Sequence, residues 1–201
     1  MSITNYSDLQ SSVANWLHRA DLAALIPDFI SLAEAKLSSD IDSRSMEANV
    51  TLTTTKGNPK VSVPADMLEM IRLKYCGAYD KPLKYLAPDE LTADYGNKRT
   101  GEPEVFTVIG ADIEIAPIPD VAYSLSLAYM QRIPALSNSN TTNWLLSSWP
   151  NAYLYGALCA AQPYLINDAR LPVFQALYKE AVEGINSIDW YSGSTMRVKA
   201  R

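Results

Sequence analysis

The last third of the chain holds a long aromatic and apolar run, Asn143-Trp-Leu-Leu-Ser-Ser-Trp-Pro-Asn-Ala-Tyr-Leu-Tyr-Gly-Ala-Leu-Cys-Ala-Ala-Gln-Pro-Tyr-Leu-Ile-Asn-Asp168. A polar linker rich in Thr, Asn and Ser, residues 137–143, leads into it. Because proline is favoured in the first turn of a helix, we expect a helix from Ser148 or Trp149 to about Ile166. Its Tyr, Leu and Ala side chains offer no obvious chemistry. The run therefore predicts the central packing helix of a helical bundle.

Two amphipathic helices are predicted near the N-terminus. The first begins at a capping-box pattern of Ser7 and Gln10, and the second follows Pro27 and runs to about Ser43. In the second helix, apolar residues at four-residue steps form one face, and Glu34 is expected on the other. A last helix, near the C-terminus, carries an apolar stripe made up of Val173, Leu177, Ala181, Ile185 and Ile188.

Between these helical parts, the pattern changes to short alternating runs rich in Val, Thr and Ile. Residues 47–55 and 60–63 are expected to form one hairpin, and residues 105–109 and 112–116 a second hairpin around Gly110. Short strands with regular turns predict an antiparallel β-sandwich or a partly open barrel. Further strands are expected at residues 68–76, 82–86 and 123–129, with a short helix from Pro88 that ends before Gly96.

We therefore predict an α+β fold in which the N- and C-terminal helix pairs form a four-helix bundle and an antiparallel β unit is inserted between them. The expected division assigns residues 1–45 to the first helix pair and residues 46–135 to the β unit. Residues 136–189 are assigned to the second helix pair, and residues 190–201 to an extended basic tail. A chain of 201 residues is long enough to bury the core that such a fold needs.

The formal net charge of −5 is unevenly distributed along the chain. Residues 190–201 contain three basic groups and no acid, whereas residues 1–189 carry 14 basic and 22 acidic groups, a net charge of −8. The acidic charge of residues 1–189 disfavours non-specific binding of nucleic acid. The basic tail could bind an acidic partner or simply be exposed to solvent. The candidate residues for docking a partner are Trp190, Tyr191, Met196, Arg197, Val198, Lys199 and Arg201.

The sequence also bears on location. No window holds eighteen unbroken apolar residues, and the first residues lack the pattern of a signal peptide. Cys76 and Cys159 lie far apart in apolar company, which favours buried free thiols in a reducing compartment. We expect a protein that is made in the cytoplasm and has no membrane span.

No constellation of residues predicts catalysis. His18 is the single histidine, so a site with several histidine ligands is excluded, and its place at the end of the first helix favours a structural role. Asp112 and Glu114 share one face of a predicted strand, but they flank a hairpin turn where solvated acids are common. The eight glycines form no phosphate-binding motif. We expect no enzyme activity, no cofactor and no metal site.

Several short motifs resemble those of the head–tail adaptor (connector) proteins of tailed bacteriophages. The resemblance spans nearly all of residues 3–190, and its strength comes from the order of the motifs. They are Ala14-Asn-Trp-Leu-His-Arg-Ala-Asp-Leu22, Ile26-Pro-Asp-Phe-Ile-Ser-Leu-Ala-Glu-Ala35, Val63-Pro-Ala-Asp-Met-Leu-Glu-Met70, Thr100-Gly-Glu-Pro103, Asn143-Trp-Leu-Leu146, Tyr153-Leu-Tyr-Gly-Ala-Leu158, Pro163-Tyr-Leu165 and Asp168-Ala-Arg170.

The resemblance implies a helical bundle with a β insertion. It also implies a homo-oligomeric ring, typically of twelve copies, that sits beneath the portal protein in the virion, extends the DNA channel and docks the next tail component. Genomic DNA would pass without specific binding. Many family members have a Glu close to Cys159, so an inter-subunit salt bridge at this spot is not carried over. The basic tail is the expected contact with the portal.

Two alternatives remain open from the sequence. One is a tail nozzle or head-completion component at a neighbouring position of the virion. The other, from a different class, is a ligand- or carbohydrate-binding module whose β unit would present aromatic rings. All four tryptophans fall in the helical parts or the tail, which disfavours sugar stacking on the β unit.

Overall fold

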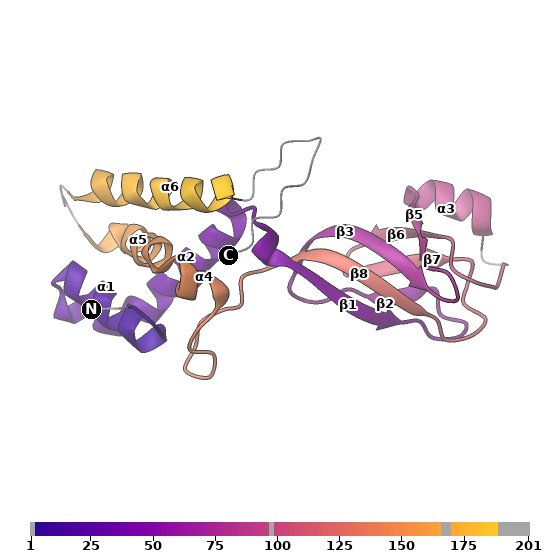
Figure 1. Ribbon diagram of the computed structural model, residues 1–201, viewed down its shortest axis with the longest axis horizontal. Helices are drawn as coiled ribbons and strands as arrows, with labels where there is room; N and C mark the ends of the chain where they lie inside the picture. Colours follow the sequence, from indigo (N-terminus) through magenta and orange to yellow (C-terminus); the bar gives the residue numbers. More distant parts are fainter. Residues whose placement is uncertain (1–2, 97–98, 166–169, 189–201) are drawn as a thin grey trace. The chain divides into compact units, whose positions relative to one another are not determined.

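The computed structural model describes residues 3–96, 99–165 and 170–188, and the chain divides into two compact units (Figure 1). Residues Met1–Met46 and Ile133–Arg201 make up a helical unit, and Glu47–Arg132 make up a β unit. The presence of helices together with antiparallel and mixed sheets confirms the predicted α+β class.

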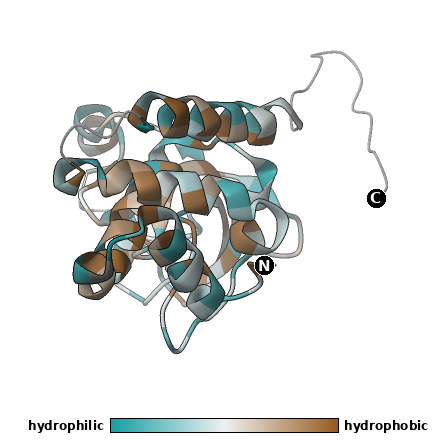
Figure 2. Ribbon diagram, turned by 90° about the vertical axis from the view of Figure 1, so that its left-hand side faces the viewer, coloured by the Kyte–Doolittle hydropathy of each residue, from teal (hydrophilic) through white to brown (hydrophobic). Residues whose placement is uncertain are grey.

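Helix α5 lies at the centre of the helical unit, where it contacts α1, α2, α4 and α6. The α-helices of this unit are α1 (Tyr6–Leu17), α2 (Ile26–Asp40), α4 (Trp144–Ser148), α5 (Pro150–Ala160) and α6 (Leu171–Ile188). Ala152, Tyr153 and Ala157 of α5 are fully buried. Apolar and polar residues occupy different faces of the surrounding helices, seen as brown and teal in Figure 2. The aromatic run therefore forms the centre of this unit, as its sequence predicts.

That run forms two helices and not one. Trp149, with φ −138° and ψ 59°, ends α4, and Pro150 begins α5. Helix α5 ends at Ala160, and a 3-10 turn follows at Gln162–Tyr164 (η4), where Pro163 cannot donate a backbone hydrogen bond. Among the described residues, the helical unit thus contains five α-helices, and the predicted four-helix bundle is not confirmed.

Two details predicted for the helices are wrong. Helix α1 begins after Asn5, whose side-chain oxygen accepts the Asp8 N–H at 2.9 Å, so Ser7 lies inside the helix. In α6 the predicted stripe is right at Ala181 and Ile185, which are buried, but rotated at its N-terminal end: Val173 is 55% exposed, and Phe174 beside it is buried. Larger aromatic side chains bury more apolar area against α5 than Val does, which favours this rotation. The buried residues of α6 are Phe174, Tyr178, Ala181, Val182 and Ile185.

The β unit is a sandwich of two four-stranded sheets. Their strand orders are β1-β8-β3-β4 and β2-β7-β6-β5, and only the β5–β6 pair is parallel. The strands are β1 (Glu47–Thr53), β2 (Lys60–Ser62), β3 (Met67–Cys76), β4 (Lys81–Pro82), β5 (Lys84–Tyr85), β6 (Val105–Ile109), β7 (Asp112–Ala116) and β8 (Ser124–Gln131). Both sheets contribute to one buried cluster, which contains Val61, Leu73, Leu83, Phe106, Ile113, Ile115, Leu125, Leu127 and Tyr129.

Two predicted elements of the β unit are divided between the sheets. The hairpin expected over residues 47–63 does not form, because β1 pairs with β8 and β2 pairs with β7. The chain changes sheet at a turn where Gly57 has φ +76°. The strand expected at 82–86 becomes β4 and β5, on either side of buried Leu83. The β6–β7 hairpin and helix α3 (Pro88–Tyr95) form as predicted.

Candidate functional site

The side chain of Asn143 joins three parts of the helical unit. Its Oδ1 accepts the Leu146 N–H at 2.8 Å and so caps α4. Its Nδ2 lies 2.7 Å from the Pro134 carbonyl oxygen and 2.6 Å from the Tyr153 hydroxyl oxygen, and it donates to both. Because Asn143 is buried, these bonds satisfy the polar atoms of its own side chain, which water cannot readily reach.

The network continues to a buried carboxylate on α2. The Tyr153 hydroxyl donates to Glu34 Oε1 at 3.3 Å, and the same oxygen accepts the Leu136 N–H at 2.7 Å. Burial raises the pKa of Glu34, and the two donated hydrogen bonds oppose that rise. Burial, with the nearby Glu34 carboxylate, also raises the pKa of Tyr153 well above its ordinary value. Glu34 therefore faces the core, and the prediction that it lies on the opposite face of its helix is wrong.

Helix α6 is tied to the C-terminal end of α2. The Tyr178 hydroxyl donates to Asp40 Oδ2 at 2.8 Å. The Asn186 side chain donates to the Asp40 carbonyl at 3.0 Å and accepts the Asp42 N–H at 3.0 Å. Asn186 thus satisfies backbone groups at the end of α2, which ends at Asp40, before the predicted Ser43.

A groove of about 710 Å³ lies between α2 and α6, with α5 as its floor. The charged groups on its walls pair within the protein: Lys36 Nζ lies 4.6 Å from the centre of the Tyr178 ring, and Lys179 lies 3.6 Å from Glu183. On the floor, burial raises the pKa of the Cys159 thiol, which disfavours its reactive thiolate form. The groove offers shape and apolar surface without a reactive group.

Gly156 allows the three helices to approach one another closely. A Cβ atom at this position would lie 3.2 Å from Ala33 Cβ on α2 and 3.4 Å from a ring carbon of Tyr178 on α6. A larger residue would force these helices apart.

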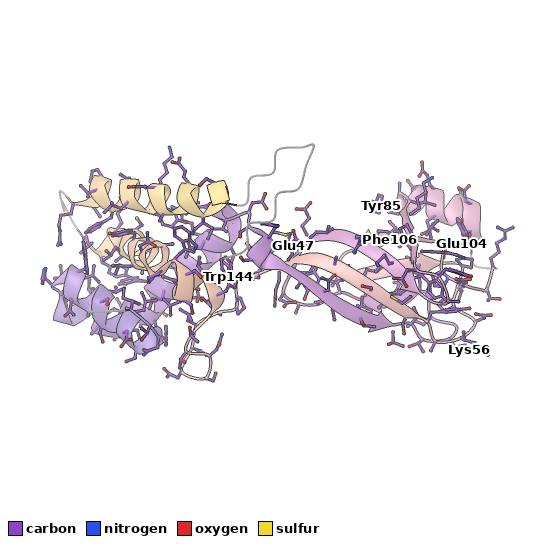
Figure 3. The ribbon with its side chains drawn as sticks, in the orientation of Figure 1. Glu47, Lys56, Tyr85, Glu104, Phe106 and Trp144 are labelled. Carbon is purple, nitrogen blue, oxygen red and sulfur yellow. The ribbon has the colours of Figure 1, made fainter. Side chains whose placement is uncertain are left out.

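The β unit presents apolar side chains beside β3 and β5. Leu68 and Ile71 of β3 are 41% and 51% exposed, at positions where the β3–β8 register shifts. Tyr85 packs edge-on against Phe106, with ring centres 5.7 Å apart, and both are labelled in Figure 3. A shallow cavity of about 320 Å³ lies at this edge of the sandwich. Its lining is formed by Met70, Ile71, Arg72, Tyr85, Phe106 and Val108.

The residues weighed for chemistry are dispersed. Asp112 accepts a hydrogen bond from the Ser62 hydroxyl at 3.0 Å across the β2–β7 pair. His18 ends α1 in a left-handed conformation, and its N–H bonds to the Ala14 carbonyl. Within the described ranges, no three His, Cys, Asp or Glu side chains gather where they could hold a metal ion. The two free cysteines fall in different units.

The predicted docking residues lie outside the described part of the chain. They are Trp190, Tyr191, Met196, Arg197, Val198, Lys199 and Arg201. The candidate site in the structure contains three residues that were not predicted as site residues: Glu34, Asn143 and Asn186. A signal existed for two of them: Glu34 falls at helical spacing with Ile30 and Leu37, and Asn143 directly precedes an apolar helix as N-caps do.

The chain belongs to the SU10 adaptor protein family, whose model matches residues 4–199. This match confirms the resemblance to phage adaptor proteins. No curated protein shows significant similarity to the chain. None of the described helices is long and apolar enough to cross a membrane.

Among solved structures, the chain is similar to one described as "Neck of empty GTA particle computed with C6 symmetry". The two share 17% sequence identity, the match covers 86% of this chain and 87% of the other, and the TM-score is 0.28.

Proposed function

We propose that this protein is a head–tail adaptor of a tailed phage. It would form a ring, of twelve copies as is typical of such adaptors, beneath the portal protein, extend the DNA channel and dock the next tail component. The observation that carries the proposal is the family match over residues 4–199, which includes both units. Its place would be the neck of the virion, after assembly in the cytoplasm of the host.

The charge of the chain supports this role. A cyclic ring needs two different complementary faces on each subunit, and its inner wall must let DNA pass. Residues 1–189 carry a net charge of −8, and a wall of like charge gives the phosphate backbone no favourable place to bind. DNA would therefore slide through the channel without specific contacts.

The tail, residues 190–201, would contact the portal. Its three basic groups and its Trp190 and Tyr191 side chains combine charge attraction with apolar surface, as interface residues often do. A nozzle or head-completion protein would occupy a neighbouring position and would bind an adaptor in place of the portal.

The test mixes the purified protein with its purified portal and examines the product by electron microscopy. We expect a ring of the protein on the portal, and a chain that ends at Asp189 should bind the portal at least tenfold more weakly, as estimated from losing three charge pairs of about 0.5–1 kcal/mol each. Absence of a ring on the portal would refute the adaptor proposal. Undiminished portal binding by the shortened chain would refute the role of the tail alone.

A further inference from the structure

One edge of the sandwich differs from the other three. An edge strand exposes unpaired backbone groups, and proteins usually protect it with bulges, prolines, charges or a short length. The edge strands β2 and β5 are short, and β2 lies between Pro59 and Pro64. At the opposite edge of the β1-β8-β3-β4 sheet, β4 pairs with the end of β3. Register shifts against β8 interrupt the remainder of β3. Strand β1, Glu47–Thr53, is paired with β8 throughout in unbroken register and contains no proline.

At the odd-numbered residues of β1, the backbone N–H and C=O groups point to the open edge of the sheet. The Thr54 N–H donates to the Tyr123 carbonyl, on the β8 side of the strand, at 2.9 Å. Because successive residues of a strand direct their backbone groups to opposite sides, the N–H and C=O of Asn49, Thr51 and Thr53 point away from β8. These groups form a row along the open edge of the first sheet.

The sequence of β1 is complementary to itself. In an antiparallel pair centred on Val50, Asn49 would face Thr51 of the second copy and Ala48 would face Leu52. The charged residue Glu47 would face the neutral Thr53, so no like charges meet. Ala48, Val50 and Leu52 pack on the core side of the sheet and are partly exposed, and a neighbouring strand would cover them.

We propose that β1 is an association edge, at which two copies of this chain pair antiparallel through residues 47–53. Asn49 and Thr51 would exchange both backbone hydrogen bonds with their partners across a two-fold axis. The pairing is two-fold and not head-to-tail, because the opposite edge of the same sheet is occupied by β4 and shifted in register. The contacts that close a ring would then lie elsewhere, and this inference stands independently of the adaptor role.

A single strand pair is a small interface, so the association is weak and depends on concentration. The full-length protein is followed by light scattering and sedimentation over a wide concentration series. The expected mass rises from that of one chain, 22.2 kDa, toward twice that value. A single-chain mass at every concentration overturns the proposal.

Two substitutions at Thr51 both remove its side chain and differ in whether the outward N–H is kept. Thr51→Pro removes that donor, and proline is tolerated where an edge N–H faces solvent, so dimerisation should be lost while the β unit stays folded. Thr51→Ala keeps the donor and should dimerise like the natural protein. Equal dimerisation of the two variants overturns the proposal.

A charge exchange tests the register without relying on proline. The double variant Asn49→Lys, Thr51→Lys should be monomeric, and so should Asn49→Glu, Thr51→Glu, because like charges then face each other across the axis. An equimolar mixture should form the mixed dimer. If the mixture stays monomeric, or if either variant alone still dimerises, the antiparallel pairing of β1 is refuted. Loss of the dimer with unchanged ring formation on the portal would separate this result from the adaptor proposal.

Discussion

Removing the side chain of Asn143 should destabilise the helical unit by more than the loss of a helix cap. In Asn143→Ala, the Leu146 N–H loses its cap, which costs about 1 kcal/mol. The partly buried hydrogen bond to the Pro134 carbonyl is also lost, and a typical hydrogen bond contributes about 0.5–1.5 kcal/mol. The Tyr153 hydroxyl keeps its contact with Glu34 and adds little. The expected loss in the free energy of unfolding is about 1.5–2.5 kcal/mol.

A serine at the same position separates the two contributions. Ser can accept the Leu146 N–H but is too short to reach Pro134, so Asn143→Ser should recover about 1 kcal/mol of the loss. Thr142→Ala, next to it, removes an exposed hydroxyl and should change stability by less than about 0.5 kcal/mol.

The assay is urea unfolding followed by tryptophan fluorescence in a Trp190→Phe background. The remaining tryptophans, Trp16, Trp144 and Trp149, all belong to the helical unit, so the signal reports that unit. Linear extrapolation then gives each difference in the free energy of unfolding. If Asn143→Ser is as stable as the natural protein, the buried network contributes nothing beyond the cap, and the reasoning fails.

The remaining predictions use the same unfolding assay. Because burial raises the folded-state pKa of Glu34 above its ordinary value of 4.5, ionising this group opposes folding, and stability should fall as the pH rises from that value through the folded-state pKa. Glu34→Gln should flatten this part of the pH profile, and an unchanged profile would show that another group is responsible. Asn186→Ala should cost about 0.5–1.5 kcal/mol, because water can replace the lost partners at the exposed end of α2. A loss below about 0.5 kcal/mol, typical of a surface change, would contradict the capping role. Gly156→Val should cost about 1–3 kcal/mol by overpacking against α2, whereas Gly184→Ala, with its nearest neighbour at 3.8 Å, should stabilise by about 0.5–1 kcal/mol. If both substitutions changed stability equally, the close approach of α2 at Gly156 would not explain the cost of Gly156→Val.

The sequence predicts where the helices and strands of this fold lie better than it predicts which strands pair. Periodicity locates α3 and the β6–β7 hairpin because both depend on local spacing and turn chemistry. It fails over residues 47–63, where two neighbouring strands separate into different sheets. Local spacing cannot reveal this separation, since alternating strands look alike whichever sheet they join. The choice is made by the shared core, to which distant residues such as Ile113 and Leu127 contribute.

The candidate site shows the same limit in a different form. Aromatic and charged residues of the sequence predict docking residues in the tail, which lies outside the described residues. Glu34 is not predicted as a site residue, because an acid on an amphipathic helix is usually solvated. Glu34 is buried because a hydroxyl and a backbone N–H, more than one hundred positions away in the sequence, supply its hydrogen bonds. Only the folded chain brings these donors to it.

The buried network also holds the segment by which the chain returns to the helical unit. The chain enters the β unit after Met46 and returns at Ile133, and both residues are buried in the helical unit. Apolar packing alone would tolerate small shifts of the returning segment, since dispersion contacts have little directionality. The hydrogen bond from the Leu136 N–H to Glu34 is directional, and a shift of the returning segment would leave these buried groups unpaired. An apolar substitute for Glu34 would supply burial but would leave the Leu136 N–H without its acceptor, so the returning segment would lose its directional contact with α2.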